Sequence, residues 1–153
     1  MQDRFDIALL HLVQRDADRT AEELAGDVPL SPSAIARRLR RLRAEGVIAR
    51  TVALLGESLT RERLRALVLV QLNEHADRAG KDALLARLDA AETVQWVLEI
   101  SGEHDLALLL DCRSMDAFVA EAEALLASSP AVRRYETSFV KRSWKFAPFV
   151  RLG

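Results

Sequence analysis

Residues 30–48, LSPSAIARRLRRLRAEGVI, carry the pattern that decides how the first third of the chain folds. Ser31 can cap the free backbone amides at the start of a helix, and Pro32 suits the first helical position because its φ is already helical. Gly46 can end the helix in a left-handed turn. This stretch is therefore predicted to be one helix with a defined beginning and end.

The predicted helix has an apolar stripe and a basic face. At about 100° per residue, side chains at three- and four-residue steps fall on one side, and here they are Ile35, Leu39 and Leu42. Guanidinium groups occupy much of the remaining surface and belong to Arg37, Arg38, Arg40, Arg41 and Arg43. Phosphate oxygens accept charge-assisted hydrogen bonds from arginine, and guanine edges accept its two-pronged fork, so this face suits DNA.

The distribution of charge favours a binding surface over an ordinary solvated face. The whole chain is nearly neutral, with 22 Lys and Arg against 23 Asp and Glu. Residues 31–50 nevertheless combine six arginines with one acid, Glu45. Basic helix faces also occur on proteins that bind nothing, so a solvated face stays open as the alternative.

The residues before this stretch predict two further helices. Residues 1–16 place apolar side chains at helical steps on an otherwise polar segment. A short helix should follow, because Thr20 and Glu23 have the spacing of a capping box. Together with the tight connection GDVPL at 26–30, the short helix and the basic helix predict a helix-turn-helix, whose second helix enters the major groove of DNA.

From Thr51 onward the pattern changes to alternating strands and helices. The order of the predicted elements is βαββαβ, with strands at LRALVLVQL, VQWVLEI, DLALLLDC and YETSFVK. The two predicted helices can cover only one face of such a sheet, yet the first and third strands are apolar at consecutive positions. A second copy of the sheet, related by a two-fold axis, is expected to cover the other face.

Composition restricts the functional classes. Half of the residues are apolar and 29% are charged, which is typical of a folded globular protein. The lone Cys112 excludes an internal disulfide and is expected to be a buried thiol. No apolar run approaches the roughly 18 residues of a membrane span, so a cytoplasmic protein without membrane contact is expected. No motif for a metal, a cofactor or catalysis is present, and none of these is predicted.

Taken together, these stretches resemble the Lrp/AsnC family of prokaryotic transcription regulators, which includes the leucine-responsive regulatory protein. The resemblance rests on DIALLHLVQRDADRTAEELA, on LSPSAIARRLRRLRAEGVI, on the βαββαβ order, on SGEHD between the middle strands and on TSFV in the last strand. It implies an α+β protein with an N-terminal three-helix winged or helix-turn-helix domain at 1–48 and a tether at 49–63. The implied C-terminal domain, 64–153, is ferredoxin-like, binds an effector, and pairs into homodimers and higher oligomers.

The resemblance also implies which residues bind. Those implied to contact double-stranded DNA are Ser31, Ser33, Arg37, Arg38, Arg40 and Arg41. Those implied for a small-molecule effector, typically an amino acid, are Gly102, Glu103, His104, Asp105, Thr137 and Ser138. A glycine turn can expose backbone amides to a carboxylate, and an aspartate can take an ammonium group. Without the family, SGEHD reads as an ordinary hairpin turn.

This sequence departs from the family pattern at two positions in its candidate sites. Pro29 stands where the family usually has glycine, and because proline cannot adopt a positive φ, the turn before the basic helix must be built differently. His104 stands where an aromatic side chain is common, and it can add pH sensitivity. Five of the eight aromatic residues lie in the last 19 positions. For them, packing against a sheet or a partner subunit is favoured over stacking on nucleic-acid bases.

Two other functions are compatible with the same layout. Some proteins with these two domains are tetrapyrrole (sirohaem-type) decarboxylases, but those enzymes tend to carry a basic-histidine signature where this chain has SGEHD. A structural oligomer that has lost DNA binding is the second alternative, and the arginine face counts against it. The sequence therefore predicts a DNA-binding regulator, not an enzyme, whose assembly and DNA affinity respond to a small molecule.

Overall fold

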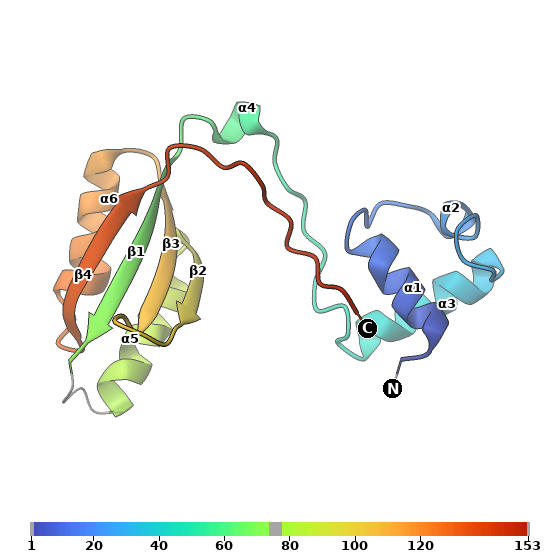
Figure 1. Ribbon diagram of the computed structural model, residues 1–153, viewed down its shortest axis with the longest axis horizontal. Coiled ribbons are helices and arrows are strands. Elements are labelled where there is room, and N and C mark those ends of the chain that lie inside the picture. The colour runs from blue at the N-terminus through green and yellow to red at the C-terminus, as the bar shows by residue number, and fades with distance from the viewer. Residues whose placement is uncertain (1, 74–77, 153) are drawn as a thin grey trace. The chain divides into compact units, whose positions relative to one another are not determined.

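The computed structural model describes residues 2–73 and 78–152 of the chain, which divides into two compact units (Figure 1). Unit 1 consists of Met1–Leu54 and Lys145–Gly153, and unit 2 consists of Leu55–Trp144. We call residues 145–153 the C-terminal tail. Unit 1 is helical, whereas unit 2 combines a sheet with helices, which confirms the predicted α+β class.

Local capping explains where the helices of unit 1 begin. Among the residues described, they are α1 (Arg4–Val13), α2 (Ala21–Leu24) and α3 (Pro32–Ala44). The predicted capping box is present, since the backbone N–H of Glu23 donates to the Thr20 hydroxyl and that of Thr20 donates to the Glu23 carboxylate. Ser31 caps α3 by accepting a hydrogen bond from the N–H of Ala34.

The connections on either side of α3 match the backbone angles of their residues. Before α3, the N–H of Leu30 donates to the carbonyl of Val28 at 2.7 Å, which makes a three-residue turn centred on Pro29. The fixed φ of proline, about −65°, suits the centre of this turn, so no positive φ is needed there. After α3, Gly46 has a φ of +71°, as predicted for a left-handed C-cap.

The core of unit 1 forms where the apolar sides of its helices meet. Its buried side chains come from α1, α2, the turn and α3, and they are Leu9, Leu24, Val28, Ile35, Leu39 and Leu42. The apolar stripe predicted for α3 is thereby confirmed. Because this stripe faces the core, the opposite side of α3 is left to the arginines.

Unit 2 has the predicted βαββαβ order. In the described part of the chain its strands are β1 (Leu64–Leu72), β2 (Val94–Glu99), β3 (Leu106–Cys112) and β4 (Val132–Phe139), and its longer helices are α5 (Arg78–Ala90) and α6 (Met115–Ala122). A short helix, α4 (Glu57–Thr60), precedes β1, and a π-helical segment, η1 (Glu123–Ala127), extends α6. The strands pair antiparallel in the order β2-β3-β1-β4, which is the ferredoxin-like topology.

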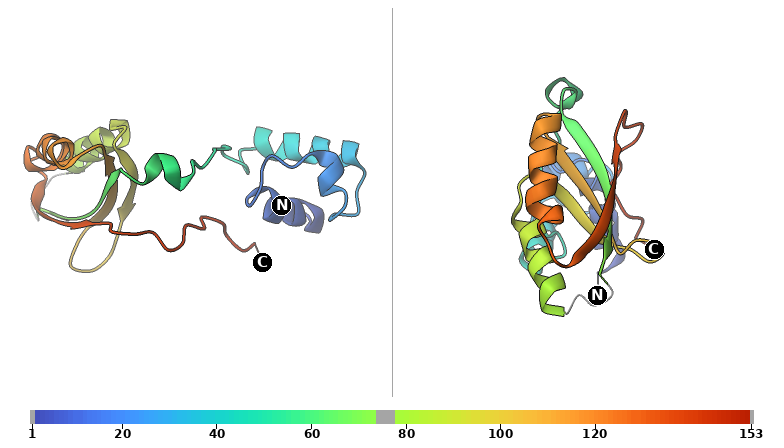
Figure 2. Two further views of the ribbon diagram at one scale, coloured as in Figure 1. Left: turned by 90° about the horizontal axis from the view of Figure 1, so that it is seen from above. Right: turned by 90° about the vertical axis from the view of Figure 1, so that its left-hand side faces the viewer.

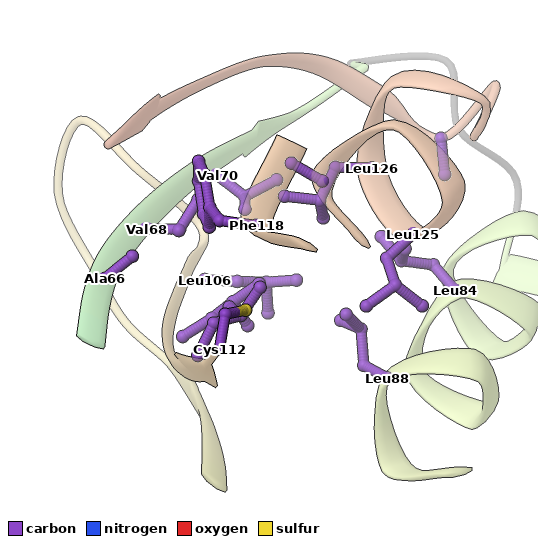
Figure 3. Close-up of a cluster of buried hydrophobic side chains, with 14 residues drawn as sticks. Ala66, Val68, Val70, Leu84, Leu88, Leu106, Cys112, Phe118, Leu125 and Leu126 are labelled. Atoms are coloured by element: carbon purple, nitrogen blue, oxygen red, sulfur yellow. The ribbon is translucent and has the colours of Figure 1, made fainter. Parts of the chain in front are cut away.

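Helices α5 and α6 cover one face of this sheet, as the right-hand view of Figure 2 shows. Burial alternates along β1, so every second side chain points toward the helices. Figure 3 shows these side chains meeting those of the helices, and the labelled members are Ala66, Val68, Val70, Leu84, Leu88, Leu106, Cys112, Phe118, Leu125 and Leu126. Cys112 is a buried free thiol, as predicted, and burial raises its pKa.

The other face of the sheet carries apolar side chains that the helices do not cover. Leu67 pairs with Leu109, and Leu109 pairs with Trp96, so these three form a row across three strands. A second row joins Leu69 to Leu98 through β3. Trp96 and Leu98 are 36% and 51% exposed. We call these two rows the open sheet face.

Candidate DNA-binding face and effector hollow

The basic helix α3 presents part of its predicted set of DNA-binding residues to solvent. Ser31, Ser33, Arg37 and Arg40 are exposed. The Ser31 and Ser33 hydroxyl oxygens lie 3.2 Å apart at the start of the helix. A patch of hydroxyls and guanidinium groups therefore lies on the side of α3 away from the core of unit 1, and it offers hydrogen-bond donors to phosphate oxygens and base edges.

Two aspartates of α1 engage other arginines of α3. One Arg38 guanidinium nitrogen, Nη1, lies 2.7 Å from Asp3 Oδ2 and 2.8 Å from Asp6 Oδ1. Arg41 Nη2 lies 2.5 Å from Asp6 Oδ2. Asp6 is only 1% exposed, so its carboxylate is buried between α1 and α3, where it pairs with both arginines. Arg38 thus ties two helices together, and Arg41, which is more exposed, divides its surface between Asp6 and solvent.

The pKa values of both aspartates, Asp3 and Asp6, are lowered. Burial on its own would raise the pKa of Asp6, but hydrogen bonds from Arg38 and Arg41 outweigh it and hold that pKa below its ordinary value. The pKa of Asp3 is lowered chiefly by the backbone N–H of Asp6 and then by Arg38. Asp3 and Asp6 also form a capping box at the start of α1. The three-residue spacing of Asp3 and Asp6 is a sequence signal for this capping box. No sequence signal indicates that they pair with arginines of α3.

The SGEHD loop between β2 and β3 is held against β1. Gly102 has a φ of +133°, which side-chain-bearing residues rarely adopt. The backbone N–H of Asp105 donates to the Val70 carbonyl at 2.9 Å, and its carboxylate accepts from the N–H of Leu72 at 2.7 Å. The Glu103 carbonyl accepts from the Gln71 side chain at 3.3 Å. These contacts show more than a free hairpin turn, because the loop is bonded to the end of the central strand.

A hollow of about 310 Å³ lies where this loop meets the ends of β1 and β4, and we call it the polar hollow. Its lining residues are Gln71, Leu72, Asn73, Lys81, Gly102, Glu103, Asp105 and Arg133. Two lining residues form ion pairs with residues outside the lining. Lys81 Nζ lies 2.6 Å from Glu99 Oε1, and Glu103 Oε1 lies 3.0 Å from Arg134 Nη2. Both signs of charge and several amide groups therefore converge on one small volume.

The fold brings together some of the predicted effector residues and separates others. Gly102, Glu103 and Asp105 line the polar hollow. Thr137 and Ser138 pair with the middle of β1 and do not line it. The His104 side chain is 12% exposed, lies 3.7 Å from Glu136, and has a buried Nε2 without a hydrogen-bond partner among the described residues.

Sequence reasoning missed three residues at the end of β1, Gln71, Leu72 and Asn73, and the two cations of the hollow. The cations are Lys81 and Arg133, and each lies in a helix or strand where a charged residue is unremarkable. Only the packing of α5 and β4 beside the loop brings them to Asp105. Within residues 2–73 and 78–152, no helix is long and apolar enough to cross a membrane, and no His, Cys, Asp and Glu side chains gather as a metal site.

A helix-turn-helix unit with an arginine-rich second helix, joined to a βαββαβ unit with a polar hollow, defines the class of two-domain DNA-binding regulators. The comparison with family models agrees: residues 3–43 match the AsnC-type helix-turn-helix domain, and residues 65–148 match the Lrp/AsnC ligand binding domain. The chain belongs to the Lrp/AsnC family of transcriptional regulators.

Relatives of known sequence or structure support the same assignment. An uncharacterized HTH-type transcriptional regulator, y4tD, of Sinorhizobium fredii is 30% identical over 90% of this chain and 81% of that protein. The glutamate uptake regulatory protein of Zymomonas mobilis is 31% identical over 76% of this chain and 70% of its own. The transcriptional regulator NMB0573 of Neisseria meningitidis, solved in complex with L-Met, superposes with a TM-score of 0.85 at 27% identity, covering 97% of this chain and 95% of that one.

These families and relatives are transcriptional regulators and not enzymes, which confirms the prediction of a non-enzymatic regulator. They do not favour the tetrapyrrole decarboxylase alternative. The chain is a transcriptional regulator with a DNA-binding helix-turn-helix domain and a ligand-binding domain.

Proposed function

We propose that this regulator binds DNA sequence-specifically through the exposed side of α3, and that an amino acid bound in the effector domain changes its assembly and DNA affinity. The exposed patch of Ser31, Ser33, Arg37 and Arg40 carries the DNA part of the proposal. Arg41 adds a phosphate contact beside this patch, and Arg38 acts from behind by holding α3 against α1. In this proposal residues 1–48 bind DNA, 49–63 form the tether, and the effector domain begins at 64.

The chemistry of the polar hollow supports an amino acid as the effector. A free amino acid presents a carboxylate and an ammonium group a few bonds apart, so its site needs both signs of charge. Lys81 and Arg133 can face the carboxylate, while Asp105, whose carboxylate has further acceptor positions, can face the ammonium group. The L-Met complex of the Neisseria relative points to the same class of ligand.

The open sheet face supports a homodimer, in which a second copy covers the rows of Leu67 and Leu69. A two-fold dimer would present two α3 helices to major-groove half-sites roughly 34 Å apart. An effector that changes assembly must then change DNA affinity, and by linkage DNA must change effector affinity to the same extent. Such a regulator would act in the cytoplasm, where its operator lies.

A mobility-shift titration tests both parts of this function. DNA from upstream of the protein's own coding region, together with genomic fragments, would be titrated at two salt concentrations, with and without a pool of amino acids. Saturable binding that weakens with salt is expected, since phosphate contacts release counterions, and the pool should shift the midpoint.

The matched variant is Asp105→Asn, which keeps an oxygen for the Leu72 N–H but removes the negative charge. Its DNA binding without effector should equal that of the parent, and its response to the pool should be lost. DNA binding absent from every fragment would refute the regulator function proposed for α3. A normal response in Asp105→Asn would refute the polar hollow as the effector site.

A further inference from the structure

The C-terminal tail contacts helix α1 through paired hydrogen bonds. Gln14, which caps the C-terminal end of α1, donates from Nε2 to the Val150 carbonyl at 2.8 Å. The Val150 N–H donates back to Gln14 Oε1 at 2.9 Å. One side-chain amide therefore satisfies both backbone groups of one tail residue, as a neighbouring strand would. His11 Nε2 lies 3.1 Å from the Leu152 carbonyl, two residues further along the tail.

An apolar groove in unit 1 lies beside these hydrogen bonds. It has a volume of about 1160 Å³ and is lined by α1, by the segment that follows α3, and by the tail itself. The tail contributes Pro148, Val150 and Leu152, which are alternate residues and so point to one side of an extended segment. Phe149, between them, lies with its ring 5.8 Å from the Arg15 guanidinium.

The tail is not part of the core on which it lies. The buried cluster of unit 1 and the apolar side chains packed against it come from residues 5–48 of the described chain. Removing the tail would therefore leave that cluster intact, although it would uncover the groove. The tail is hydrogen-bonded through its backbone to one face of α1, and the core of unit 1 does not depend on it. Such a segment can bind and dissociate reversibly.

We propose that α1 and the segment Val47–Leu54 form a docking site for this chain's own C-terminal tail, which lies along one wall of the groove. The chain leaves unit 1 after Leu54 and returns to it at Lys145, so a docked tail joins the DNA-binding unit to unit 2 a second time, without a covalent bond. Docking within one chain needs little intrinsic affinity, because the intervening residues keep the effective concentration of the tail high.

A labelled peptide tests this docking directly. The peptide Lys145–Gly153, with fluorescein at its N-terminus, would be titrated with the chain truncated after Trp144, and its fluorescence anisotropy followed. Saturable binding is expected. Gln14→Met, which keeps the length of the side chain but loses both hydrogen bonds, should weaken peptide binding about tenfold. Gln14→Glu should weaken it as well, because the carboxylate would meet the Val150 carbonyl without a donor.

Two controls complete this experiment. Gln95→Met makes the same substitution at an exposed position of β2 in unit 2 and should leave peptide binding unchanged. A peptide with the same residues in scrambled order should bind the parent protein no more tightly than the peptide of native order binds Gln14→Met. Absence of saturable binding, or equal binding to the parent and to Gln14→Met, would overturn the docking site.

The full-length protein distinguishes the chain's own tail from the tail of a second copy. Amide hydrogen exchange of residues 149–152, and of Val150 above all, should be slower in the parent than in Gln14→Met, and this difference should persist when the protein is diluted until the dimer dissociates. A difference that disappears on dilution would mean that the tail comes from another copy, which contradicts the proposal. Because neither measurement uses DNA, failure of the proposed DNA function would not affect its outcome.

Discussion

Asp6 links the first and third helices of unit 1 through a buried carboxylate. Both of its oxygens accept hydrogen bonds, Oδ1 from Arg38 and Oδ2 from Arg41. Because the pKa of Asp6 is lowered by this pairing in the folded protein, its stabilisation is present above the ordinary value of 3.8. The stabilisation is lost as the pH falls through the lower, folded pKa, since the carboxyl group then takes up a proton.

The first prediction concerns this carboxylate. Asp6→Asn should lower the free energy of unfolding at pH 7 by about 2 kcal/mol, below the usual cost of breaking a buried ion pair because Arg41 is half exposed. The loss should shrink as the pH is lowered below about 4, because the carboxyl group of the unfolded parent takes up a proton there before the folded one does. Urea unfolding followed by helical circular dichroism at pH 7 and pH 3 measures both values.

The exposed Asp18→Asn serves as the control and should change stability by less than about 0.5 kcal/mol at either pH. A loss for Asp6→Asn that is equally large at pH 3 and at pH 7 would contradict the role of its charge. It would assign the effect to packing or to the capping of α1 instead.

At the scale of the element, α3 divides its arginines between two tasks. Arg37 and Arg40 are exposed, whereas Arg38 is engaged by Asp3 and Asp6. At about 100° per residue, Arg38 lies beside the apolar stripe of α3, and from that position a long side chain can reach α1. The helix therefore exposes to solvent the side that we propose binds DNA, and it is held against α1 from the other side.

The second prediction separates these tasks by substitution with glutamine. Arg37→Gln and Arg40→Gln should each lower DNA affinity about tenfold while leaving the unfolding midpoint unchanged, because they remove contacts made only with DNA. Arg38→Gln should instead lower the unfolding midpoint first, since it leaves buried Asp6 with one partner fewer. Mobility shifts and urea unfolding on the same samples make the comparison.

Arg61→Gln, at an exposed position just before β1, is the matched control for charge and should change neither quantity strongly. If Arg37→Gln and Arg40→Gln both bound DNA like the parent, the exposed side of α3 would not be the DNA face. If Arg38→Gln unfolded at the parent's midpoint, its pairing with α1 would not contribute to stability.

The turn before α3 shows how one element tolerates a departure from the family pattern. A glycine turn can use a positive φ, which proline cannot. In this chain the turn is centred on Pro29 and is closed by the hydrogen bond from Leu30 to Val28. No non-glycine residue among those described has a positive φ, so the replacement introduces no backbone strain.

At the scale of the whole molecule, the open sheet face is an apolar surface that helices α5 and α6 leave uncovered. Leu109 lies at the centre of one of its rows, between Leu67 on β1 and Trp96 on β2. Its side chain points away from α5 and α6, because its neighbours Leu108 and Leu110 are buried beneath them.

The third prediction tests whether a second copy covers this face. Leu109→Lys should weaken dimerisation on the order of 100-fold, because a two-fold axis places the substitution twice in the interface and each leucine loses its burial. The helices and their core should remain folded. Light scattering across a dilution series measures the mass, and circular dichroism checks the fold.

Val119→Lys is the matched control, since Val119 is an exposed apolar residue on the outer side of α6. It should dimerise like the parent. A folded Leu109→Lys protein with the parent's mass at every concentration would show that the open sheet face is not the dimer interface.

Much of this architecture was predictable because the responsible interactions are local. The capping box of Thr20 and Glu23, the serine cap at Ser31 and the glycine stop at Gly46 each act within a few residues. The same holds for the apolar period of α3 and the alternation along β1, so element order and the direction of each face follow from the sequence.

The candidate sites were only partly predictable, since they depend on residues that meet across the fold. The loop of Gly102 and Asp105 was found by its resemblance to a family, but Lys81 and Arg133 join it through the packing of α5 and β4. Likewise, the helical period places Arg38 nearer the apolar stripe than Arg37, but it gives no sign of the aspartates of α1 with which Arg38 pairs.

Apart from the short helix α4, the sequence by itself determined the helices, the strands, their order, their apolar faces and the family, because these depend on spacing along the chain. Only the tertiary structure decided which arginines stay available to DNA, which residues line the polar hollow and where the C-terminal tail lies. Asp6 and Arg38 are 32 residues apart in sequence, and Gln14 and Val150 are 136 apart. Such partners are selected by the packing of whole elements, which no spacing rule along the chain encodes.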